Sequence, residues 1–428
     1  SDQKSVILQM NKELDESFSG SSFFSMARLL QGDVGSGKTL VAFFACLRAV
    51  DSGFQCAILS PTELLSRQHA ENAARLLEPI SGVRLAYLTG NIQAKGRNKL
   101  LTELSQGSID IVIGTHALFS KNVHYKHLRF AVIDEQHRFG VIQRNLIIEK
   151  GRSQEGKAPS FLMMSATPIP QTLALTVFGD LDVSVLRTMP PGRKCIQTHL
   201  TRAGNEARVY EAVRKEISDG HQAYFVYPLI EKADEETDQQ DYLFDKKTEL
   251  KSAEDMYSFL QKEVYPEFSC ALVHSKVDEE DQHRILTDFS KGKIQILVAT
   301  TVVEVGVDVP NATCMIIEHA ERFGLAALHQ LRGRVGRGKD QSHCFLIYSS
   351  KLTDAGKERL KAMHETTDGF QIAELDLKLR GPGEVSGIQQ SGNLLLGIAD
   401  PLRDKEILLQ ARKDVYEYLK DQSKSLTL

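Results

Sequence analysis

Short apolar segments recur along the first half of the chain, and stretches long enough for a helix separate them. The segments are nearly continuous runs rich in Val, Ile and Leu, without a regular alternation of apolar and polar residues. Such runs are typical of strands buried on both faces of a parallel sheet, and helical connections between them fit right-handed crossovers. We therefore predict strands within residues 26–31, 55–62, 109–116, 129–135 and 161–167.

The same rhythm returns in the second half, after the segment MPPGRK (189–194), whose two prolines and one glycine predict a linker. The expected strands there lie within residues 222–229, 270–275, 294–301, 312–319 and 342–349. The pattern as a whole predicts an α/β fold with two doubly wound parallel-sheet domains in tandem.

Two segments break this rhythm. Residues 231–241, EKADEETDQQD, are polar and acidic, and we interpret them as a surface loop. From about Lys351 onward the pattern becomes helical, with an interruption at RGPGE (380–384). These observations predict a first domain over residues 1–192, a second over 193–350 and a C-terminal helical extension over 351–428.

Composition and charge exclude several classes of protein. The 428 residues include no stretch near the ~18 consecutive apolar residues of a membrane span, and no signal peptide opens the chain. Six cysteines are scattered singly without a C-x-x-C pair, which indicates reduced core thiols in a cytoplasmic protein without a zinc site. The net charge of −4 gives no general attraction to nucleic acid, so a DNA partner would need a local basic groove. Because the chain begins with Ser-Asp-Gln rather than Met, we interpret it as part of a longer protein.

The segment GDVGSGKT (32–39) has the form G-x-x-x-x-G-K-[ST] and lies between an expected strand and an apolar helical segment. Glycines let backbone N–H groups approach phosphates closely, and a helix N-terminus favours negative charge. Lys38 would reach the β- and γ-phosphates of ATP, and the Thr39 hydroxyl would bind Mg²⁺. The alternative is a glycine-rich turn without a ligand. The expected nucleotide-binding residues here are Gly32, Gly35, Ser36, Gly37, Lys38 and Thr39.

Two adjacent carboxylates stand at the end of an expected strand, in AVIDEQHRFG (131–140). Two charges are costly to bury at such a place unless they bind a partner. We expect Asp134 to supply the second acidic contact to Mg²⁺, and Glu135 to polarise a water for attack on the γ-phosphate. A solvent-facing strand end is the alternative.

Three arginines cluster in HQLRGRVGRG (329–338) of the second domain, namely Arg332, Arg334 and Arg337. They could form a solvated helix face or a patch that binds a phosphate backbone. Their density beside glycines favours close approach to a charged ligand, and arginine is suited to stabilise a transferring phosphoryl group. If they reach the phosphate-binding loop, ATP lies between the two domains, and hydrolysis opens and closes that cleft as in a motor.

Motifs along nearly the whole chain resemble those of superfamily 2 helicases, in the expected order. These are GDVGSGKT, PTELLSRQH (61–69), GTHAL (114–118), DEQH (134–137), SATPIP (165–170), ATTVVEVGVDVP (299–310) and QLRGRVGR (330–337). Together with MPPGR and the tail DGFQIAELDLKLRGPGEVSGIQQSG (368–392), they resemble the RecG family of ATP-dependent DNA helicases. The motor of a transcription-repair coupling factor is the nearest alternative. It would be expected to read Asp-Glu-Glu-His, so Gln136 and the tail favour the RecG family.

The resemblance implies two RecA-like domains, followed by a helical hairpin and loop that couple ATP turnover to translocation along double-stranded DNA. It implies branch migration, replication-fork regression and recombinational repair, with forks and Holliday junctions as DNA partners. ATP and Mg²⁺ would be the cofactors, a single-stranded DNA-binding protein a further partner, and we expect a monomer without a membrane association. A nucleotide-gated module that grips DNA without moving is an alternative from another class.

The resemblance also assigns roles to single residues. Gln3 would read adenine, Gln330, Arg334 and Arg337 would sense the γ-phosphate, and Gly306 and Asp308 would contact the nucleotide or its ribose. The residues expected to couple ATP to DNA or to contact DNA are His137, Ser165, Thr167, Thr62, Thr115, Thr301, Arg380 and Gln390. For each threonine, a helix cap or turn is the alternative, and for RGPGE a tight turn.

The sequence departs from the family pattern in three respects. The family carries an N-terminal wedge domain that splits branched DNA, and no such segment occurs here, so we expect fork-specific unwinding to depend on a part outside this sequence. His274-Ser275 stands where His-Gly is common, and the acidic segment after Ile230 is longer than expected. We interpret the last two departures as surface variation.

Overall fold

The apolar runs of the first half form the strands of one parallel sheet with the order β3-β4-β2-β5-β6-β1-β7. Every pairing in this sheet is parallel. Its strands are β1 (Ala27–Gly32), β2 (Gln55–Leu59), β3 (Leu85–Leu88), β4 (Ile111–Gly114), β5 (Leu128–Ile133), β6 (Ser160–Ser165) and β7 (Asp182–Leu186).

The second half forms a second parallel sheet with the order β10-β11-β9-β12-β13-β8. Its strands are β8 (Gln197–Arg202), β9 (Gln222–Val226), β10 (Cys270–Val273), β11 (Ile296–Ala299), β12 (Ala312–Ile317) and β13 (His343–Tyr348). The prediction of two doubly wound parallel-sheet domains is therefore confirmed.

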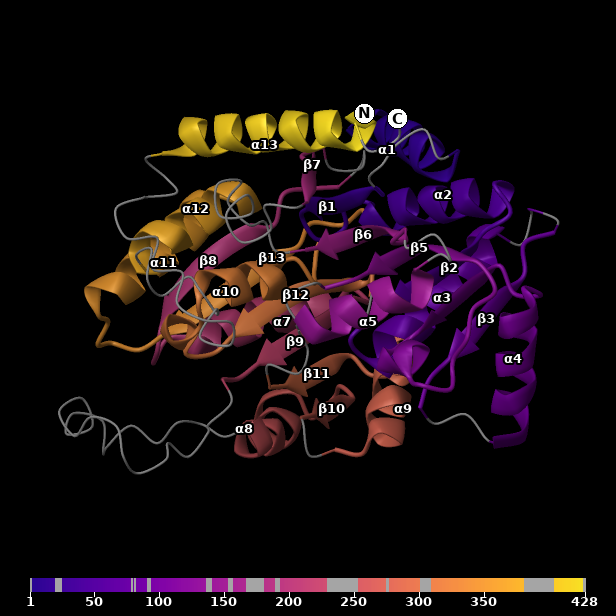
Figure 1. The fold of residues 1–428 in the computed structure, drawn as a ribbon. Helices are drawn as coiled ribbons and strands as arrows, with labels where there is room; N and C mark the ends of the chain where they lie inside the picture. The colour runs from indigo at the N-terminus through magenta and orange to yellow at the C-terminus, as the bar shows by residue number, and fades with distance from the viewer. Residues whose placement is uncertain are drawn as a thin grey trace, which may run out of the picture. The chain divides into compact units, whose positions relative to one another are not determined.

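The computed structural model (Figure 1) describes residues 2–19, 25–77, 80, 82–90, 94–135, 141–152, 157–166, 181–188, 193–228, 253–274, 277–300, 309–380 and 404–425. Contacts divide the chain into a first unit, Ser1–Pro190 with Leu377–Leu428, and a second unit, Pro191–Asp376. None of the helices in the described ranges is long and apolar enough to cross a membrane.

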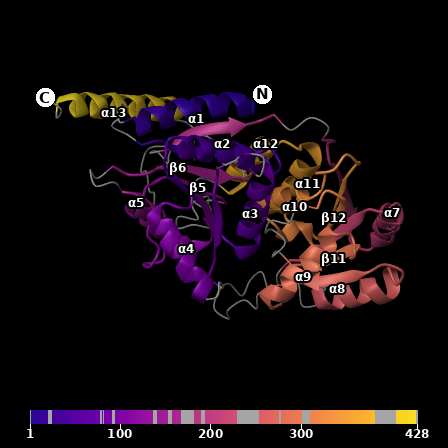
Figure 2. The same ribbon diagram turned by 90° about the vertical axis from the view of Figure 1, so that its right-hand side faces the viewer.

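Helices cover both faces of the first sheet. Successive side chains of β5 belong alternately to two core clusters, one on each face. Phe130 and Val132 belong to the core cluster with residues of α1, α2 and α3, whereas Ala131 and Ile133 belong to the cluster with residues of α4 and α5. Figure 2 shows α1 and α2 on one side of the strands and α4 and α5 on the other. These helices are α1 (Asp2–Phe18), α2 (Lys38–Asp51), α3 (Glu63–Leu77), α4 (Ala94–Gln106) and α5 (Val141–Gly151).

The second sheet carries helices in the same way. One core cluster joins its strands to α7 and α8, and on the opposite face Tyr224 of β9 packs edge-to-face against Phe289 of α9. The helices of this unit are α7 (Glu206–Ser218), α8 (Ala253–Phe259), α9 (Glu279–Ser290), α10 (Leu325–Arg332) and α11 (Asp354–Glu365). Helix α12 (Gly369–Arg380) begins in the second unit and ends in the first.

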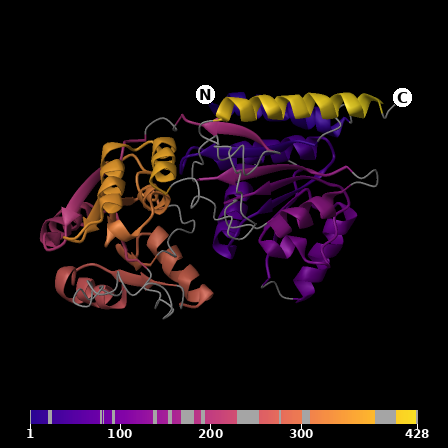
Figure 3. The same cartoon turned by 60° about the vertical axis from the view of Figure 1, so that its left-hand side comes forward.

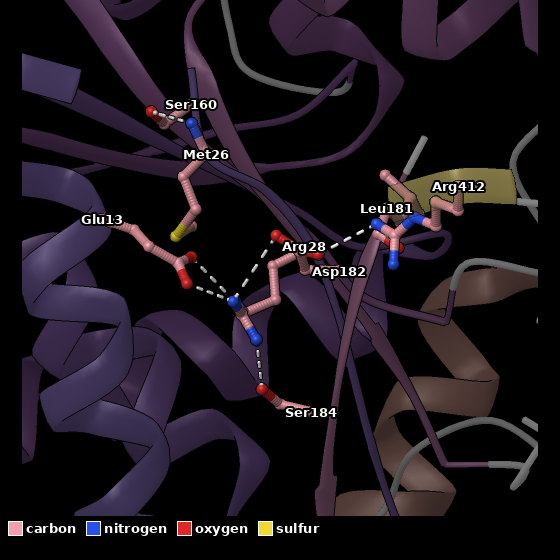
Figure 4. A network of polar contacts seen from close by, with 8 residues as sticks. All are labelled: Glu13, Met26, Arg28, Ser160, Leu181, Asp182, Ser184 and Arg412. Atoms are coloured by element: carbon pink, nitrogen blue, oxygen red, sulfur yellow. Dashed lines mark hydrogen bonds and ion pairs between the residues drawn. The ribbon is translucent and has the colours of Figure 1, made fainter. Parts of the chain in front are cut away.

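A buried arginine ties α1 to the strand that leads into the phosphate-binding loop (Figure 4). Arg28 of β1 is 1% exposed and forms a two-point ion pair with the Glu13 carboxylate of α1. Its Nη1 also donates to the Ser184 hydroxyl of β7 at 2.6 Å. Because an unpaired buried charge costs several kcal/mol, these contacts hold α1, β1 and β7 in one arrangement.

The same network continues to the last helix, α13 (Lys405–Ser425). Asp182 of β7 lies 3.7 Å from Arg28, and its other oxygen accepts a hydrogen bond from Arg412 of α13 at 2.9 Å. Arg412 also donates to the Leu181 carbonyl at 2.9 Å. Figure 3 shows α13 along the same side of the first unit as α1. The C-terminal helix is thus anchored to an edge strand of the first sheet.

Candidate nucleotide-binding site

The loop after β1 has the backbone that phosphate binding requires. Gly35 and Gly37 have φ values of 78° and 87°, in the left-handed region that favours glycine. Gly37 is the N-cap of α2, which begins at Lys38. The loop therefore leads directly into a helix N-terminus, where backbone N–H groups and the helix dipole favour an anion.

Side chains pack closely around this loop. A Cβ on Gly32 would lie 2.5 Å from the Ser36 hydroxyl oxygen and 3.0 Å from Cβ of Leu186, so the position requires glycine. The Ser36 hydroxyl is buried without a hydrogen-bond partner among the described residues, and a phosphate oxygen would satisfy it. Lys38 is 9% exposed, and its ammonium donates to the carbonyls of Gly32 at 2.7 Å and Asp33 at 3.0 Å. These residues fit a nucleotide phosphate.

Gln3 lies directly against the phosphate-binding loop. Its amide donates to the Ser36 carbonyl at 3.0 Å, and a Cβ on Gly37 would come within 2.1 Å of the same amide nitrogen. Helix α1, which carries Gln3, is fixed at its start by Asp2, whose carboxylate accepts the backbone N–H groups of Arg187 and Thr188 at 2.9 and 2.8 Å. This placement agrees with the expected nucleotide-contacting role, which stays a prediction.

Asp134 follows β5 and is held at both carboxylate oxygens. One oxygen accepts the Glu135 N–H at 3.0 Å, and the other lies 2.7 Å from Nε2 of His69. Burial raises the pKa of Asp134, but the His69 hydrogen bond and the charges of His69 and Lys38 outweigh burial and lower the pKa below its ordinary value. Asp134 is therefore an ionised carboxylate under the influence of Lys38. With the Thr39 hydroxyl on α2, it provides the oxygen ligands that Mg²⁺ prefers.

Glu135 has a strained backbone, with φ of 52°. A residue with a Cβ pays roughly 1 kcal/mol or more for this conformation, and such strain persists where the surroundings enforce it, often at functional sites. The geometry turns the chain sharply after Asp134, so that the two neighbouring carboxylates need not point the same way. This observation agrees with separate roles for Asp134 and Glu135.

The hydroxyl residues expected to contact DNA lie at strand ends. The Thr62 hydroxyl accepts the Leu65 N–H at 3.4 Å, so it also serves as a weak cap of α3. Thr115 is the N-cap residue of a short 3₁₀-helix, but its buried hydroxyl has no partner among the described residues. Ser165, which is expected to couple ATP to DNA rather than to contact DNA, ends β6 and is buried. The DNA contacts of Thr62 and Thr115 and the coupling role of Ser165 stay predictions.

The arginine segment of the second unit divides into two kinds of residue. Arg332 is buried and donates to the carbonyls of Met363 and Thr366 at 2.8 and 3.0 Å, so it joins α10 to the end of α11. Arg334 is buried in the turn after α10, whereas Gln330 and Arg337 are half-buried. Arg332 is therefore structural, and a γ-phosphate role for the other three stays a prediction.

Several expected site residues fall outside the described part of the chain. These are His137, Thr167, Thr301, Gly306, Asp308 and Gln390. For Arg380, the last residue of α12, the backbone is described but the side chain is not. Conversely, the sequence interpretation did not single out His69, which ends the motif PTELLSRQH and contacts Asp134.

The cysteines agree with the interpretation as thiols. Cys46, Cys56, Cys270, Cys314 and Cys344 are free and buried, and burial raises the pKa of Cys314 and Cys344 to about 12. Cys195 is also free but exposed. The five buried cysteines therefore serve as small apolar core residues.

Comparison with known proteins identifies the family. Models for the DEAD/DEAH box helicase and for the helicase conserved C-terminal domain match residues 3–176 and 211–339. A model for the C-terminal part of domain 3 of ATP-dependent DNA helicase RecG matches residues 366–426. ATP-dependent DNA helicase RecG of Treponema pallidum is 54% identical over 99% of this chain. The chain belongs to the RecG family.

Other RecG proteins support this assignment. RecG of Borreliella burgdorferi is 47% identical over 93% of the chain. The solved structure of RecG bound to a three-way DNA junction matches 95% of the chain and 50% of that protein, with a TM-score of 0.74 and 42% identity. RNA-bound Mss116p shares the fold, with a TM-score of 0.60 and 16% identity. The resemblance to the RecG family is confirmed, and a transcription-repair coupling factor is not favoured.

The chain spans only part of its RecG relatives, namely 60% of the Treponema pallidum protein and 55% of the Borreliella burgdorferi protein. The RecG-family match therefore concerns the two helicase units and the C-terminal helices.

Proposed function

We propose that this chain is a DNA-dependent ATPase that translocates along double-stranded DNA, in branch migration, fork regression and recombinational repair. The observation that supports it most strongly is the loop after β1: its positive-φ glycines, Gly35 and Gly37, lead into the N-terminus of α2, and the buried Ser36 hydroxyl there has no partner among the described residues. Lys38, at the start of α2, is close enough to Asp134, after β5, for its charge to lower the pKa of that carboxylate. A loop lysine beside an ionised strand-end carboxylate is the arrangement that P-loop ATPases use.

The residues have distinct tasks in this proposal. Backbone N–H groups of residues 35–39 bind the phosphates, and Lys38 moves from its carbonyl partners to phosphate oxygens. Asp134 and Thr39 would hold Mg²⁺, which when bound neutralises charge on the β- and γ-phosphates. Glu135 accepts a proton from the attacking water as general base. Gln330, Arg334 and Arg337 are proposed to stabilise the transferring phosphoryl group.

Branched double-stranded DNA is the proposed partner. A RecG relative has been solved on a three-way DNA junction, and its sequence matches this chain over both units. We include a single-stranded DNA-binding protein as a further partner and a monomer as the working state. The chain covers 50% of that relative's length.

Hydrolysis of ATP tests the proposal, measured without DNA, with linear duplex and with a model fork. DNA should stimulate ATP hydrolysis by the wild-type protein. In Lys38→Ala the DNA-stimulated rate should fall by at least about 100-fold, because a preorganised cation at the phosphates is removed. Lys99→Ala, on an exposed side chain of α4, is the matched control and should match wild type. Unchanged hydrolysis by Lys38→Ala would show that the nucleotide site is assigned wrongly.

Triplex displacement tests translocation separately from hydrolysis. A motor strips a third strand from duplex DNA in the presence of ATP, whereas a nucleotide-gated clamp binds without stripping it. Hydrolysis without displacement would leave the ATPase assignment intact and contradict translocation. Equal stimulation by duplex and fork would indicate that this chain alone does not select branches.

A further inference from the structure

His69 stands in an unusual place for a polar residue. On α3 the buried positions are Ser66, His69, Ala73 and Leu77, which follow helical spacing and form the stripe that packs on the sheet. An apolar residue would satisfy that stripe, yet an imidazole occupies it and is only 7% exposed. A buried polar group at such a position needs a partner, and the partner here is Asp134.

The contact has a defined direction. Nε2 of His69 lies 2.7 Å from Oδ2 of Asp134, and an ionised carboxylate can only accept a hydrogen bond, so Nε2 is the donor. The other oxygen, Oδ1, accepts the Glu135 N–H at 3.0 Å. Together the two bonds prevent rotation of the carboxylate. Among the described residues, removal of the imidazole would leave the Asp134 carboxylate with one hydrogen bond, from the Glu135 N–H.

The position of the imidazole is itself fixed by the start of α3. The Thr62 carbonyl accepts the Ser66 N–H at 3.0 Å, and the Ser66 hydroxyl donates to the Glu63 carbonyl at 2.9 Å and lies 3.2 Å from the Tyr87 hydroxyl of β3. His69 therefore projects from a helix that is anchored to the sheet one turn earlier. Because contacts other than Asp134 fix the position of the imidazole, His69 can determine the orientation of the Asp134 carboxylate.

We propose that His69 is a positioning residue for the proposed ATPase site: by donating to Oδ2 it holds the Asp134 carboxylate in the orientation that binds the Mg²⁺–nucleotide complex. The proposal rests on the proposed function, since it concerns the same site. Outer residues that orient a metal ligand typically contribute about 10–100-fold to metal affinity. The effect should therefore appear in Mg²⁺ dependence rather than in nucleotide affinity as such.

The test compares two substitutions that differ in one donor. His69→Gln places an amide N–H near the position of Nε2, whereas His69→Leu fills similar space without a donor. The affinity of a fluorescent ATP analogue is measured with Mg²⁺ and with EDTA, and the Mg²⁺ concentration for half-maximal hydrolysis is measured beside it. For His69→Leu we expect that concentration to rise about 10–100-fold, with little change in affinity in EDTA. His69→Gln should lie within about threefold of wild type.

Leu77→Ala is the control on the same helix, because it truncates a buried apolar side chain of the same stripe about two turns beyond His69. It should lower thermal stability without changing Mg²⁺ dependence. Should His69→Leu fail to fold, His69→Asn gives the same comparison, because its shorter amide does not reach Oδ2. Unchanged Mg²⁺ dependence in a folded variant that lacks the donor would overturn the proposal. Absence of Mg²⁺-dependent nucleotide binding in wild type would instead overturn the proposed function.

Discussion

The strand ends after β5 and β12 have nearly the same backbone but different chemistry. In the first sheet β5 lies between β2 and β6, and in the second β12 lies between β9 and β13. Asp134 donates its N–H to the Leu59 carbonyl at 2.9 Å, and Glu318 donates its N–H to the Val226 carbonyl at 2.9 Å. In both places a carboxylate residue thus follows the strand and continues its ladder by one bond.

The resemblance extends to the next residue. Glu135 and His319 have φ values of 52° and 50°, and they are the two non-glycine residues with positive φ in the described part of the chain. The sharp turn after the strand is therefore shared by the two units, and it does not by itself point to a catalytic role. Backbone strain alone does not identify the site.

The difference between the two units lies in the loop after the strand that is two places away in the sheet. β1 pairs with β6 and leads into the phosphate-binding loop with Lys38, whereas β8 pairs with β13 and leads through a short turn into α7. In that turn the Gly204 N–H donates a hydrogen bond to the Glu206 carboxylate at 2.9 Å. A carboxylate at that helix start disfavours phosphate, so among the described residues this turn does not offer what the loop after β1 offers.

The largest expected effect separates the two strand-end carboxylates. Glu135→Gln should reduce ATP hydrolysis by about 100-fold or more while nucleotide still binds, because general bases typically contribute 10²–10⁴-fold. Glu318→Gln, at the corresponding position of the second unit, should stay within about threefold of wild type. Steady-state hydrolysis and nucleotide-binding measurements on both variants check this. Equal losses would show that the second strand end also takes part in catalysis.

The next effect concerns two buried arginines with different partners. Arg28→Met should destabilise the protein by about 3 kcal/mol, the low end for breaking a buried ion pair, because the Glu13 side chain it leaves behind is 26% exposed. Arg332→Met leaves uncharged carbonyls behind and should cost about 1–3 kcal/mol. Chemical denaturation of each variant gives the comparison.

The loss of stability in Arg28→Met should become smaller as the pH falls, whereas the loss in Arg332→Met should not. Burial raises the pKa of Glu13 even beside Arg28, and without Arg28 that pKa rises further above its unfolded value. The penalty in Arg28→Met is therefore present at neutral pH and disappears as the pH falls below the unfolded pKa of Glu13, where the carboxyl is neutral in both states. The Arg332→Met penalty should show no such recovery. Parallel pH profiles would contradict the assignment of the Arg28 effect to Glu13.

A smaller effect tests the shared backbone strain. His319→Gly should stabilise the protein by about 0.5–1 kcal/mol, because glycine adopts positive φ without a Cβ penalty, and hydrolysis should persist. Glu135→Gly should bring a similar gain in stability but abolish hydrolysis. Thermal unfolding measures the change in stability of the two variants, and ATPase measurements show which of them still hydrolyses ATP. A loss of stability in either variant would show that side-chain contacts outweigh the strain.

The smallest effect compares the two helices on one side of the first unit. Helix α1 buries Val6, Met10 and Leu14, whereas α13 is attached through Arg412, whose side chain is 33% exposed. Arg412→Ala should therefore cost no more than about 1 kcal/mol overall. Amide hydrogen exchange should become faster in α13 while exchange in α1 stays unchanged. Faster exchange in both would show that the network transmits changes from α13 to α1.

Periodicity identified the central strands and one edge strand, β10, but not the other three strands at the sheet edges. β3, β7 and β8 went unpredicted, and each lies at the edge of its sheet. Their side chains are largely half-buried or exposed, as in β8, which has no fully buried residue. In β7 and β8 polar residues interrupt the apolar ones, so these two edge strands lack the continuous apolar run that marks a central strand.

The phosphate-binding loop and the acidic pair were recognisable because their residues are neighbours in the chain. His69 was not, because its partner Asp134 lies 65 positions away and a single histidine in a helical stripe is unremarkable by itself. The same holds for Arg332, which reads as part of a surface arginine cluster but is buried against α11. Its neighbours in space, rather than its neighbours in sequence, determine its role.

By itself, the sequence determined the two parallel sheets and the family, and it predicted the nucleotide loop and the strand-end carboxylates, because each depends on local periodicity or on residues at fixed spacing. Tertiary structure decided which polar groups meet: His69 with Asp134, Arg28 with Glu13, and Arg412 with Asp182. It also divided the tail, with α11 in the second unit and α13 in the first. The physical reason is that these pairings join residues far apart in the chain, and only the packing of whole elements around each sheet brings them within hydrogen-bond distance.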